Sequence, residues 1–341
     1  MKPITVLECL SFLSLLGTGL NILLSDHHFF ALADHFRFQF CLIGILIFIP
    51  LLIKRNPWAF AAILATVTQA TWILPWYLRL PAQECPNPLK VMVANVLSSN
   101  PEPEKFLTWF KNQEFDIVGL LEINKAWNER LSPIREIYPY HIEIPIEDNF
   151  GLSLYSRHPI KNSSVTQYHA DSPISIEATI TLSSDQEILV ILTHPVPPIG
   201  SEMAKIRQEQ LHGMIQRIQL IQDKPLLVMG DFNMTMGEPL YFQFEKQTGL
   251  TNCRRGFGWL SSWRVGTAFA IPIDHIFYRD GFRHQNMIIG PDIGSDHRPV
   301  LAFLCLETAI TKSTNPLNVR VLEVHLSRNF IIHKNCVSQK Q

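Results

Sequence analysis

Three long apolar runs in the first eighty residues constrain the fold of this chain more than any other feature. They cover residues 7–24, 36–53 and 58–78. Each is close to the length of about 17–25 residues that an α-helix needs to span a bilayer. Trp58 opens the third run and Trp76 lies near its end, as expected for side chains that favour the membrane interface. The sequence therefore predicts a membrane region over residues 1–80 with three transmembrane helices.

Two alternatives stay open for these runs. Lys2 before a short apolar core is also typical of a signal peptide, although the first run lacks a clear small-x-small cleavage site. The second and third runs could be buried helices of a soluble protein, but their length and adjacency favour membrane spans.

Basic residues predict the orientation. Lys54 and Arg55 lie between the second and third runs, whereas residues 25–34, expected to be a loop, contain two Asp and no Lys or Arg. Arg37, near the end of its run, is expected to extend toward the interface. Because short cytoplasmic loops are enriched in Lys and Arg, we expect Lys54 and Arg55 in the cytoplasm. The rest of the chain is then extracytoplasmic, on a multi-pass protein of the inner (cell) membrane.

Charge divides the remaining chain. Residues 81–88 form a proline-rich linker, and residues 86–307 carry nineteen Lys and Arg against twenty-five Asp and Glu. This mildly acidic balance does not favour a long nucleic acid as a partner, since such binding needs a basic surface. The basic C-terminal tail, residues 308–341, is expected to be a loosely ordered terminus. Binding of the tail to anionic lipid or to the acidic domain is the alternative.

The six cysteines are scattered along the chain. No pair has the spacing of zinc ligands, so we expect no structural zinc site. The sequence alone does not pair them into disulfides.

From Leu89 onward, strand-like stretches alternate with helix-like ones. Predicted strands cover residues 89–94, 117–121, 151–155, 174–182, 188–192, 226–229, 276–278 and 300–304, and predicted helices cover 103–112 and 201–221. This pattern predicts two packed β-sheets with helices outside.

Polar side chains recur where these strands end. The set is Asn95, Glu122, His194, Asp231, Asn233, Asp274, Asp296 and His297. In Gly230-Asp231-Phe232-Asn233, an acid and an amide two residues apart follow an apolar strand and could hold a water molecule against a phosphate. Taken singly, each has an ordinary explanation, such as a turn, a surface carboxylate or a hydrogen-bonded loop histidine. Their joint occurrence favours a catalytic site.

In order and spacing, seven blocks resemble the endonuclease/exonuclease/phosphatase superfamily, which has the deoxyribonuclease I-like fold. They are Val93-Ala94-Asn95-Val96, Leu120-Leu121-Glu122, Gly151-Leu152-Ser153-Leu154-Tyr155-Ser156-Arg157, Thr193-His194, Gly230-Asp231-Phe232-Asn233, Ile273-Asp274-His275-Ile276 and Gly294-Ser295-Asp296-His297-Arg298-Pro299. The resemblance covers about residues 89–307 and implies a four-layer α/β/β/α sandwich of the α+β class. With transmembrane helices in front, the chain is similar to membrane-anchored bacterial members.

The resemblance also implies roles for the polar set. Asn95 and Glu122 would hold Mg²⁺ (or Mn²⁺), a hard cation suited to oxygen ligands, and Asp296 would serve the metal directly or indirectly.

The remaining residues would act on the water and the phosphate. Asp231 would orient or deprotonate the attacking water, with Asn233 helping to place it. Asp274 would hydrogen-bond His297, which would donate to the phosphate. His194 would contact the phosphate or help the leaving oxygen.

Two positions depart from the abasic-site nucleases that the superfamily includes. Some of these carry an Asp where this chain has Leu97, and they have Tyr-type chemistry where it has His194. Both weaken a role in DNA repair, and His194 is instead similar to deoxyribonuclease, sphingomyelinase and inositol-phosphatase branches. Trp263 resembles a family tryptophan near the site, with plain core packing as the alternative.

The leading hypothesis is a membrane-anchored, Mg-dependent phosphohydrolase that cleaves a phosphodiester (or phosphomonoester) by water attack. Its expected partners are the lipid bilayer and a phosphate-ester substrate, for which a lipid head group is one candidate. One alternative is an extracytoplasmic nuclease. The other is a catalytically inactive, membrane-tethered binding module, against which the intact polar set argues. No protein partner is predicted.

Overall fold

The computed structural model describes residues 5–24, 28–78, 85–182, 186–222 and 224–306. The predicted tail, residues 308–341, and half of the predicted linker, residues 81–84, lie outside the described residues.

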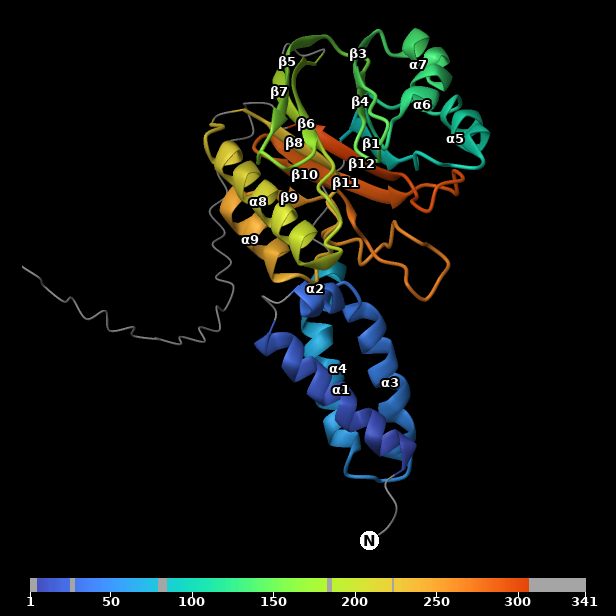
Figure 1. Ribbon diagram of the computed structural model, residues 1–341, viewed down its shortest axis with the longest axis vertical. Helices are drawn as coiled ribbons and strands as arrows, with labels where there is room; N and C mark the ends of the chain where they lie inside the picture. Colours follow the sequence, from blue (N-terminus) through green and yellow to red (C-terminus); the bar gives the residue numbers. More distant parts are fainter. Residues whose placement is uncertain (1–4, 25–27, 79–84, 183–185, 223, 307–341) are drawn as a thin grey trace, which may run out of the picture. The chain divides into compact units, whose positions relative to one another are not determined.

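The chain opens with helices α1 (Val6–Leu23), α2 (His28–Asp34), α3 (Arg37–Ile53) and α4 (Ala59–Ile73), and a 3₁₀ turn, η1 (Leu74–Tyr77), follows α4. Helices α1, α3 and α4 pack side by side (Figure 1). By length and composition alone, Val6–Leu23 and Ala59–Tyr77 could each cross a membrane, whereas the apolar α3 is shorter. The expectation of a loop over residues 25–34 was wrong for its second part, because this stretch contains no Gly or Pro and forms α2.

The three packed helices turn many apolar side chains outward and several polar side chains inward, around a small apolar core. Exposed positions include Leu13, Leu23, Leu46, Ile53 and Phe60, and buried ones include Ser11, Thr18, Asn21, Thr66 and Gln69. The buried side chains find partners across the helices, as when Gln69 Nε2 donates to Thr18 Oγ1 at 3.2 Å. At Gly44 the backbones approach so closely that a Cβ would lie 2.2 Å from Thr66 Oγ1. Small residues and buried hydroxyls or amides between helices are typical of membrane bundles.

Two six-stranded mixed sheets follow. The first sheet contains β1 (Leu89–Asn95), β2 (Ile117–Leu121), β3 (Tyr140–Ile144), β4 (Leu152–Ser156), β11 (Phe282–Ile289) and β12 (Val300–Leu306), in the order β11-β12-β1-β2-β4-β3. The second contains β5 (Ile160–Gln167), β6 (Ile174–Thr181), β7 (Glu187–Thr193), β8 (Leu226–Asp231), β9 (Thr251–Asn252) and β10 (Asp274–Arg279), in the order β5-β6-β7-β8-β10-β9.

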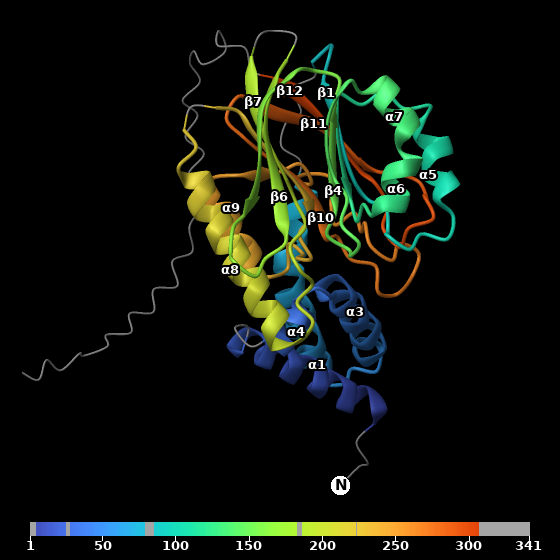
Figure 2. The same ribbon diagram turned by 45° about the horizontal axis from the view of Figure 1, so that its top comes forward.

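The sheets pack face to face, with helices outside. Helices α5 (Pro103–Phe110), α6 (Lys125–Arg130) and α7 (Ser132–Ile137) cover the first sheet, whereas α8 (Gly200–Gln219) and α9 (Pro239–Thr248) cover the second (Figure 1). Figure 2 shows the same layers with the top of the molecule turned forward.

The side chains along each strand point alternately to the two faces of its sheet, and this explains the layers of the sandwich. In β1, Val91 faces the core between the sheets, whereas Met92 packs under the helices of the first sheet. In β8, Leu227 faces the central core and Val228 packs under α8 and α9. Because successive side chains point to opposite faces, a strand covered on both sides reads as one continuous apolar run. The predicted four-layer sandwich is confirmed.

A disulfide joins Cys85 to Cys305, 220 residues later, with their Cα atoms 5.9 Å apart. It ties the chain just before β1 to the end of β12, which is the neighbour of β1 in the first sheet. The covalent link fixes the point at which the chain enters the sandwich.

The N-terminal helices share a hydrophobic core with the sandwich. Trp76 is buried with residues of β8, α8 and α9, and its carbonyl accepts hydrogen bonds from Gly256 N (3.0 Å) and Gly258 N (2.9 Å). Arg37 is also buried, and its Nε donates to Gly237 O at 2.7 Å. The expectation that Arg37 extends toward the membrane interface was therefore wrong, because a backbone carbonyl and Asp34 hold the guanidinium inside the protein.

Candidate active site

Strand pairing in the first sheet brings the first group of polar residues together. Parallel pairing of β1 with β2 places Asn95 opposite Leu121, so Glu122 lies beside Asn95. Antiparallel pairing of β1 with β12 brings the loop before β12 to the same edge. From this loop, Ser295 Oγ donates to Asn95 O at 2.8 Å.

Pairing in the second sheet supplies the other group. Parallel pairing of β7 with β8 places Thr193 opposite Gly230, so His194 and Asp231 are neighbours. Antiparallel pairing of β8 with β10 places Asp274 opposite Asp231. The predicted strand-end residues therefore converge from both sheets on one edge of the sandwich.

Gly230 and Asp231 end strand β8, so they do not form the turn that was the ordinary explanation of this motif. Glycine is required at position 230, because a Cβ there would lie 1.8 Å from Thr193 O on the neighbouring strand. The chain turns only at Asn233, whose φ is 48° and whose N–H donates to Asp231 Oδ1 at 2.8 Å.

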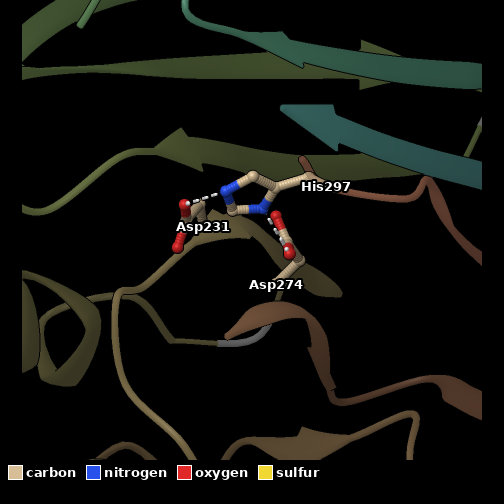
Figure 3. Close-up of side chains that lie close together, drawn as sticks. All are labelled: Asp231, Asp274 and His297. Atoms are coloured by element: carbon tan, nitrogen blue, oxygen red, sulfur yellow. Dashed lines mark hydrogen bonds and ion pairs between the residues drawn. The ribbon is translucent and has the colours of Figure 1, made fainter. Parts of the chain in front are cut away.

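His297 lies between two carboxylates (Figure 3). Its Nδ1 is 2.9 Å from Asp274 Oδ2, and its Nε2 is 3.6 Å from Asp231 Oδ2. Burial by itself would lower the pKa of His297, but the charges of Asp274 and Asp231 outweigh burial and raise it to about 10. The ring is therefore an imidazolium at neutral pH and can donate from both nitrogens.

Asp231 is the centre of the site. Besides His297, its Oδ2 has His194 Nε2 at 3.5 Å and Asn95 Nδ2 at 3.4 Å. Burial opposes ionisation, but His297 and His194 together hold the pKa of Asp231 below its usual value. Asp231 is thus a buried carboxylate that stays ionised.

Glu122 is a second carboxylate that faces the side chain of Asn95. Its Oε1 accepts from Asn95 Nδ2 at 2.9 Å, and its Oε2 accepts from Ser98 N at 3.0 Å. The carboxylates of Glu122 and Asp231 therefore converge on one point, the amide of Asn95. Such a set of oxygen donors fits a hard divalent cation.

A second combination of ligand atoms lies next to the first. Asp231, Asp274 and His297 each offer one atom, and these atoms lie within 4.8 Å of one another, close enough to hold a metal ion. A protonated His297 has no lone pair for a metal, however, so the oxygen set around Glu122 fits a cation better.

Asp296 occupies a different position from the rest of the predicted set. It is exposed, and its Oδ2 accepts from Trp263 Nε1 at 2.8 Å. Trp263 in turn lies beside the His297 ring, with ring centroids 6.4 Å apart. Trp263 is thus a wall of the site, in contrast to the alternative of plain core packing.

A cavity of about 380 Å³ lies over this edge. Six of the eight predicted residues line it, namely Glu122, His194, Asp231, Asn233, Asp296 and His297. Asn95 and Asp274 are buried and contact the lining residues Glu122 and His297. The candidate active site is therefore an open pocket with a polar floor.

Three lining residues adopt left-handed backbone conformations without being glycine. They are Leu97 (φ 60°), Glu122 (φ 63°) and Asn233 (φ 48°). Such conformations are uncommon outside glycine and gather at functional sites, where the surrounding structure holds them.

Sequence reasoning missed the side chains that hold the catalytic loops. Ser295 Oγ accepts from His297 N at 3.0 Å, and Ser262 Oγ accepts from Asp274 N at 3.2 Å. Ser295 could have been found, because it lies inside the motif that contains His297. His275, also in a motif, instead contacts Met234 O at 2.7 Å and supports the loop after β8.

A second buried polar cluster, beside the site and including the cavity-lining His35, was also missed. Glu238 lies 2.7 Å from Arg207 Nη2 and 2.7 Å from His35 Nε2, and it accepts from Thr235 N at 3.0 Å. Arg207 also donates to Asn233 O. Burial opposes ionisation of Glu238, but Arg207 and His35 lower its pKa to about 2. The only sequence signal was Asp34, His35 and Arg37 within an apolar segment, where charged groups are costly unless paired.

Comparison with known proteins places this geometry in a family. The sequence model of the Endonuclease/Exonuclease/phosphatase family matches residues 92–297, more than half of the chain. The chain belongs to this family, which includes phosphodiesterases, nucleases and phosphatases, and it is a hydrolase of the class that acts on phosphoester bonds. Enzymes of the family typically use divalent metal ions.

Solved structures share the fold at low sequence identity. D. rerio TDP2 complexed with single-strand DNA product is 17% identical, with a TM-score of 0.54, and the match covers 64% of this chain and 98% of that one. The human Nocturnin catalytic domain with bound sulfate anion is 20% identical, with a TM-score of 0.55 and coverages of 64% and 94%. An endonuclease/exonuclease/phosphatase from Beutenbergia cavernae is 17% identical, with a TM-score of 0.54 and coverages of 65% and 72%. No curated protein matches the chain.

Proposed function

We propose that this protein is a membrane-anchored, metal-dependent phosphohydrolase that cleaves a phosphodiester or phosphomonoester by water attack. The observation that carries the proposal is the buried Asp274–His297–Asp231 arrangement beside the converging carboxylates of Glu122 and Asp231. It combines an ionised carboxylate, a cationic hydrogen-bond donor and a set of oxygen donors that would hold a cation at the floor of one cavity.

Glu122 and the side-chain oxygen of Asn95 would hold Mg²⁺ or Mn²⁺, with Asp231 beside them. When bound, the cation would neutralise charge on the phosphate. Presenting its oxygen requires the Asn95 amide to turn, because its nitrogen now faces both carboxylates. Asp296 stays a candidate for an additional ligand, with its Oδ2 engaged by Trp263.

The side chains of this protein would divide the reaction between them. Asp231 would orient the water and take its proton as the water oxygen bonds to phosphorus, with Asn233 fixing the Asp231 carboxylate. His297, held by Asp274, would donate from Nε2 to a phosphate oxygen and stabilise the developing charge. His194 would hydrogen-bond the leaving oxygen as the ester P–O bond breaks.

The test uses the full-length protein in detergent with bis-p-nitrophenyl phosphate and Mg²⁺. We expect release of p-nitrophenolate that disappears on addition of EDTA and returns with excess Mg²⁺. Asp231→Ala and His297→Ala should each abolish it, whereas Glu104→Ala, an exposed carboxylate on α5, should not. Full activity in EDTA would overturn the metal role, and full activity of Asp231→Ala would overturn the assigned site.

The exterior of the helical bundle supports the membrane anchor. Its outward side chains are apolar while hydroxyls and amides are buried, the reverse of a soluble bundle. The structure also separates the ends of α3. Arg37 at its start contacts the sandwich, whereas Lys54 and Arg55 follow its last residue at the other end.

The disulfide supports an extracytoplasmic catalytic domain, because such bonds persist in oxidising compartments. In intact cells, a membrane-impermeant maleimide should label Cys85 and Cys305 only after external reduction. Labelling of these two cysteines only after the cells are opened would place the domain in the cytoplasm, and their labelling in intact cells without reduction would show that they form no disulfide. A C-terminal periplasmic-type reporter fusion checks the orientation independently.

A further inference from the structure

The walls of the cavity differ from its floor. Above the catalytic side chains, the lining is largely apolar and comes from four parts of the chain. The apolar wall residues are Leu32 in α2 and Phe36 after it, Phe150, Pro197, Pro198 and Ile199 before α8, and Ile271 and Ile273 before β10, whereas His35 and Asn149 are polar residues of the same lining. Such a surface favours a substrate that carries apolar groups next to its phosphate.

Lysine and arginine side chains, which are expected around a polyanionic substrate, do not contribute to the described lining of this cavity. Among the described residues that line the cavity, none is a lysine or an arginine. Proteins that track a nucleic acid backbone use several such contacts, because phosphate neutralisation supplies most of the affinity. The floor of the cavity can bind one phosphate, but the lining offers no row of positive charges for successive phosphates of a nucleic acid.

The apolar wall continues outward to the rim. Ile199 lines the cavity and is nevertheless 72% exposed. Phe269, 58% exposed, has its ring centroid 6.2 Å from that of Phe36. Phe36 directly precedes α3, whose outward side chains are apolar. An apolar path therefore leads from the catalytic floor toward the surface that the helices present to a bilayer.

From these observations we propose that the substrate is an amphiphile, a phosphoester whose apolar chain lies along this path while its phosphate reaches Asp231 and His297. The inference rests on the proposed function and adds the class of substrate. Helix α2 and Phe36 then contribute to substrate binding, because Leu32 and Phe36 form part of the wall. The apolar chain would come from a lipid of the membrane in which the helices lie.

A series of p-nitrophenyl alkyl phosphodiesters tests the inference while the leaving group stays constant. Methyl, butyl, hexyl and octyl esters are compared below their critical micelle concentrations, with full-length protein and Mg²⁺. Because a buried methylene is worth about 0.8 kcal/mol, kcat/KM should rise by up to about fourfold for each added carbon. A series that is cleaved without dependence on chain length would overturn the amphiphile and leave the phosphohydrolase intact. Failure to cleave any member, the methyl ester included, would overturn the proposed function and the inference together.

Two matched variants locate the chain-binding surface. Ile199→Asp places a charge on the rim and should lower the octyl-to-methyl ratio of kcat/KM at least tenfold. Val165→Asp, an equally drastic change at an exposed position on β5 that does not line the cavity, should leave the ratio unchanged. Equal ratios for wild type and Ile199→Asp would contradict the assigned path.

Natural lipids identify the kind of ester. Mixed micelles with phosphatidylglycerol present a diester, and micelles with phosphatidic acid present a monoester. Cleavage of either lipid supports the proposal of an amphiphilic substrate, and the lipid that is cleaved shows whether the enzyme acts on a diester or on a monoester. Faster cleavage of a single-stranded oligonucleotide than of both lipids would instead favour a nuclease.

Discussion

Two buried polar clusters lie on either side of the loop that follows β8, and they differ in their balance of positive and negative charge. The catalytic cluster contains Glu122, Asp231 and Asp274 against His194 and His297. The junction cluster contains Asp34 and Glu238 against Arg37, Arg207 and His35. Only the second has enough positive charge for its carboxylates without an added ion.

This difference assigns a purpose to each cluster. Buried ions are stable only when paired and hydrogen-bonded, and breaking such a pair is costly. Carboxylates in excess, by contrast, repel one another, which lowers the stability of the folded protein and favours the binding of a cation. We therefore expect changes in the catalytic cluster to alter activity and changes in the junction cluster to alter stability.

The largest effect should come from the catalytic cluster. Asp231→Asn keeps the shape of the side chain but removes the charge that orients the water and holds His297. We expect kcat to fall about a thousandfold, the range for loss of a catalytic base together with electrostatic stabilisation. The melting temperature should change little, because the lost attraction to His297 and His194 is offset by relief of the repulsion between Asp231 and Asp274. A loss of several degrees would show that Asp231 is mainly structural and would remove the contrast between the clusters.

The junction cluster should show the reverse. Glu238→Gln leaves Arg207 and His35 without their carboxylate, and such a break typically costs about 3–5 kcal/mol. For a protein of this size, that corresponds to a fall in melting temperature of roughly 6–15 °C, measured in detergent. Glu102→Gln, an exposed partner of Lys105, is the control and should change little. An unchanged melting temperature for Glu238→Gln would contradict a structural role.

How far the sequence predicted these clusters depends on where their residues lie. Most of the catalytic residues end or follow a buried strand, whereas Asp274 begins β10 and His297 lies shortly before β12, so each stands next to an apolar run and can be recognised there. His35 and Glu238 are about two hundred residues apart, and neither stands in a pattern that indicates the other. Arg37 was misassigned for the same reason, since only the three-dimensional structure brings Gly237 to it.

The prediction of strands from the sequence was limited in the same way. β1, β2 and β8 are covered on both faces and were predicted from continuous apolar runs. β5 and β11 were not predicted, because they lie at sheet edges and polar, solvent-accessible residues make up most of β5 and half of β11. Alternation is lost in such strands, and hydrogen bonds to a neighbouring strand define them instead.

The stability of the junction cluster should depend on pH. The pKa of Glu238 is lowered from its ordinary value of 4.5 to about 2 in the folded protein, so its contribution is fully present above pH 4.5. It is lost as the pH falls from 4.5 toward 2, and it amounts to about 3 kcal/mol at most. The difference in melting temperature between wild type and Glu238→Gln should therefore shrink between pH 6 and pH 3. A difference that stays constant over this range would show that the carboxylate charge is not what stabilises the cluster.

The smallest expected effect is the shift in melting temperature on addition of a metal ion, which should also distinguish the two clusters. A cation that binds only the folded protein stabilises it by about 2.7 kcal/mol at one hundred times its dissociation constant. Mg²⁺ should therefore raise the melting temperature of wild type by a few degrees and that of Glu238→Gln by the same amount, because the junction cluster offers no net negative charge. Glu122→Gln should lose the response, since its carboxylate is half of the converging pair. Ca²⁺, larger and also oxygen-seeking, tests whether the site selects by size. An equal shift in Glu122→Gln and wild type would place the cation elsewhere, and the charge excess at the catalytic floor would then need another explanation.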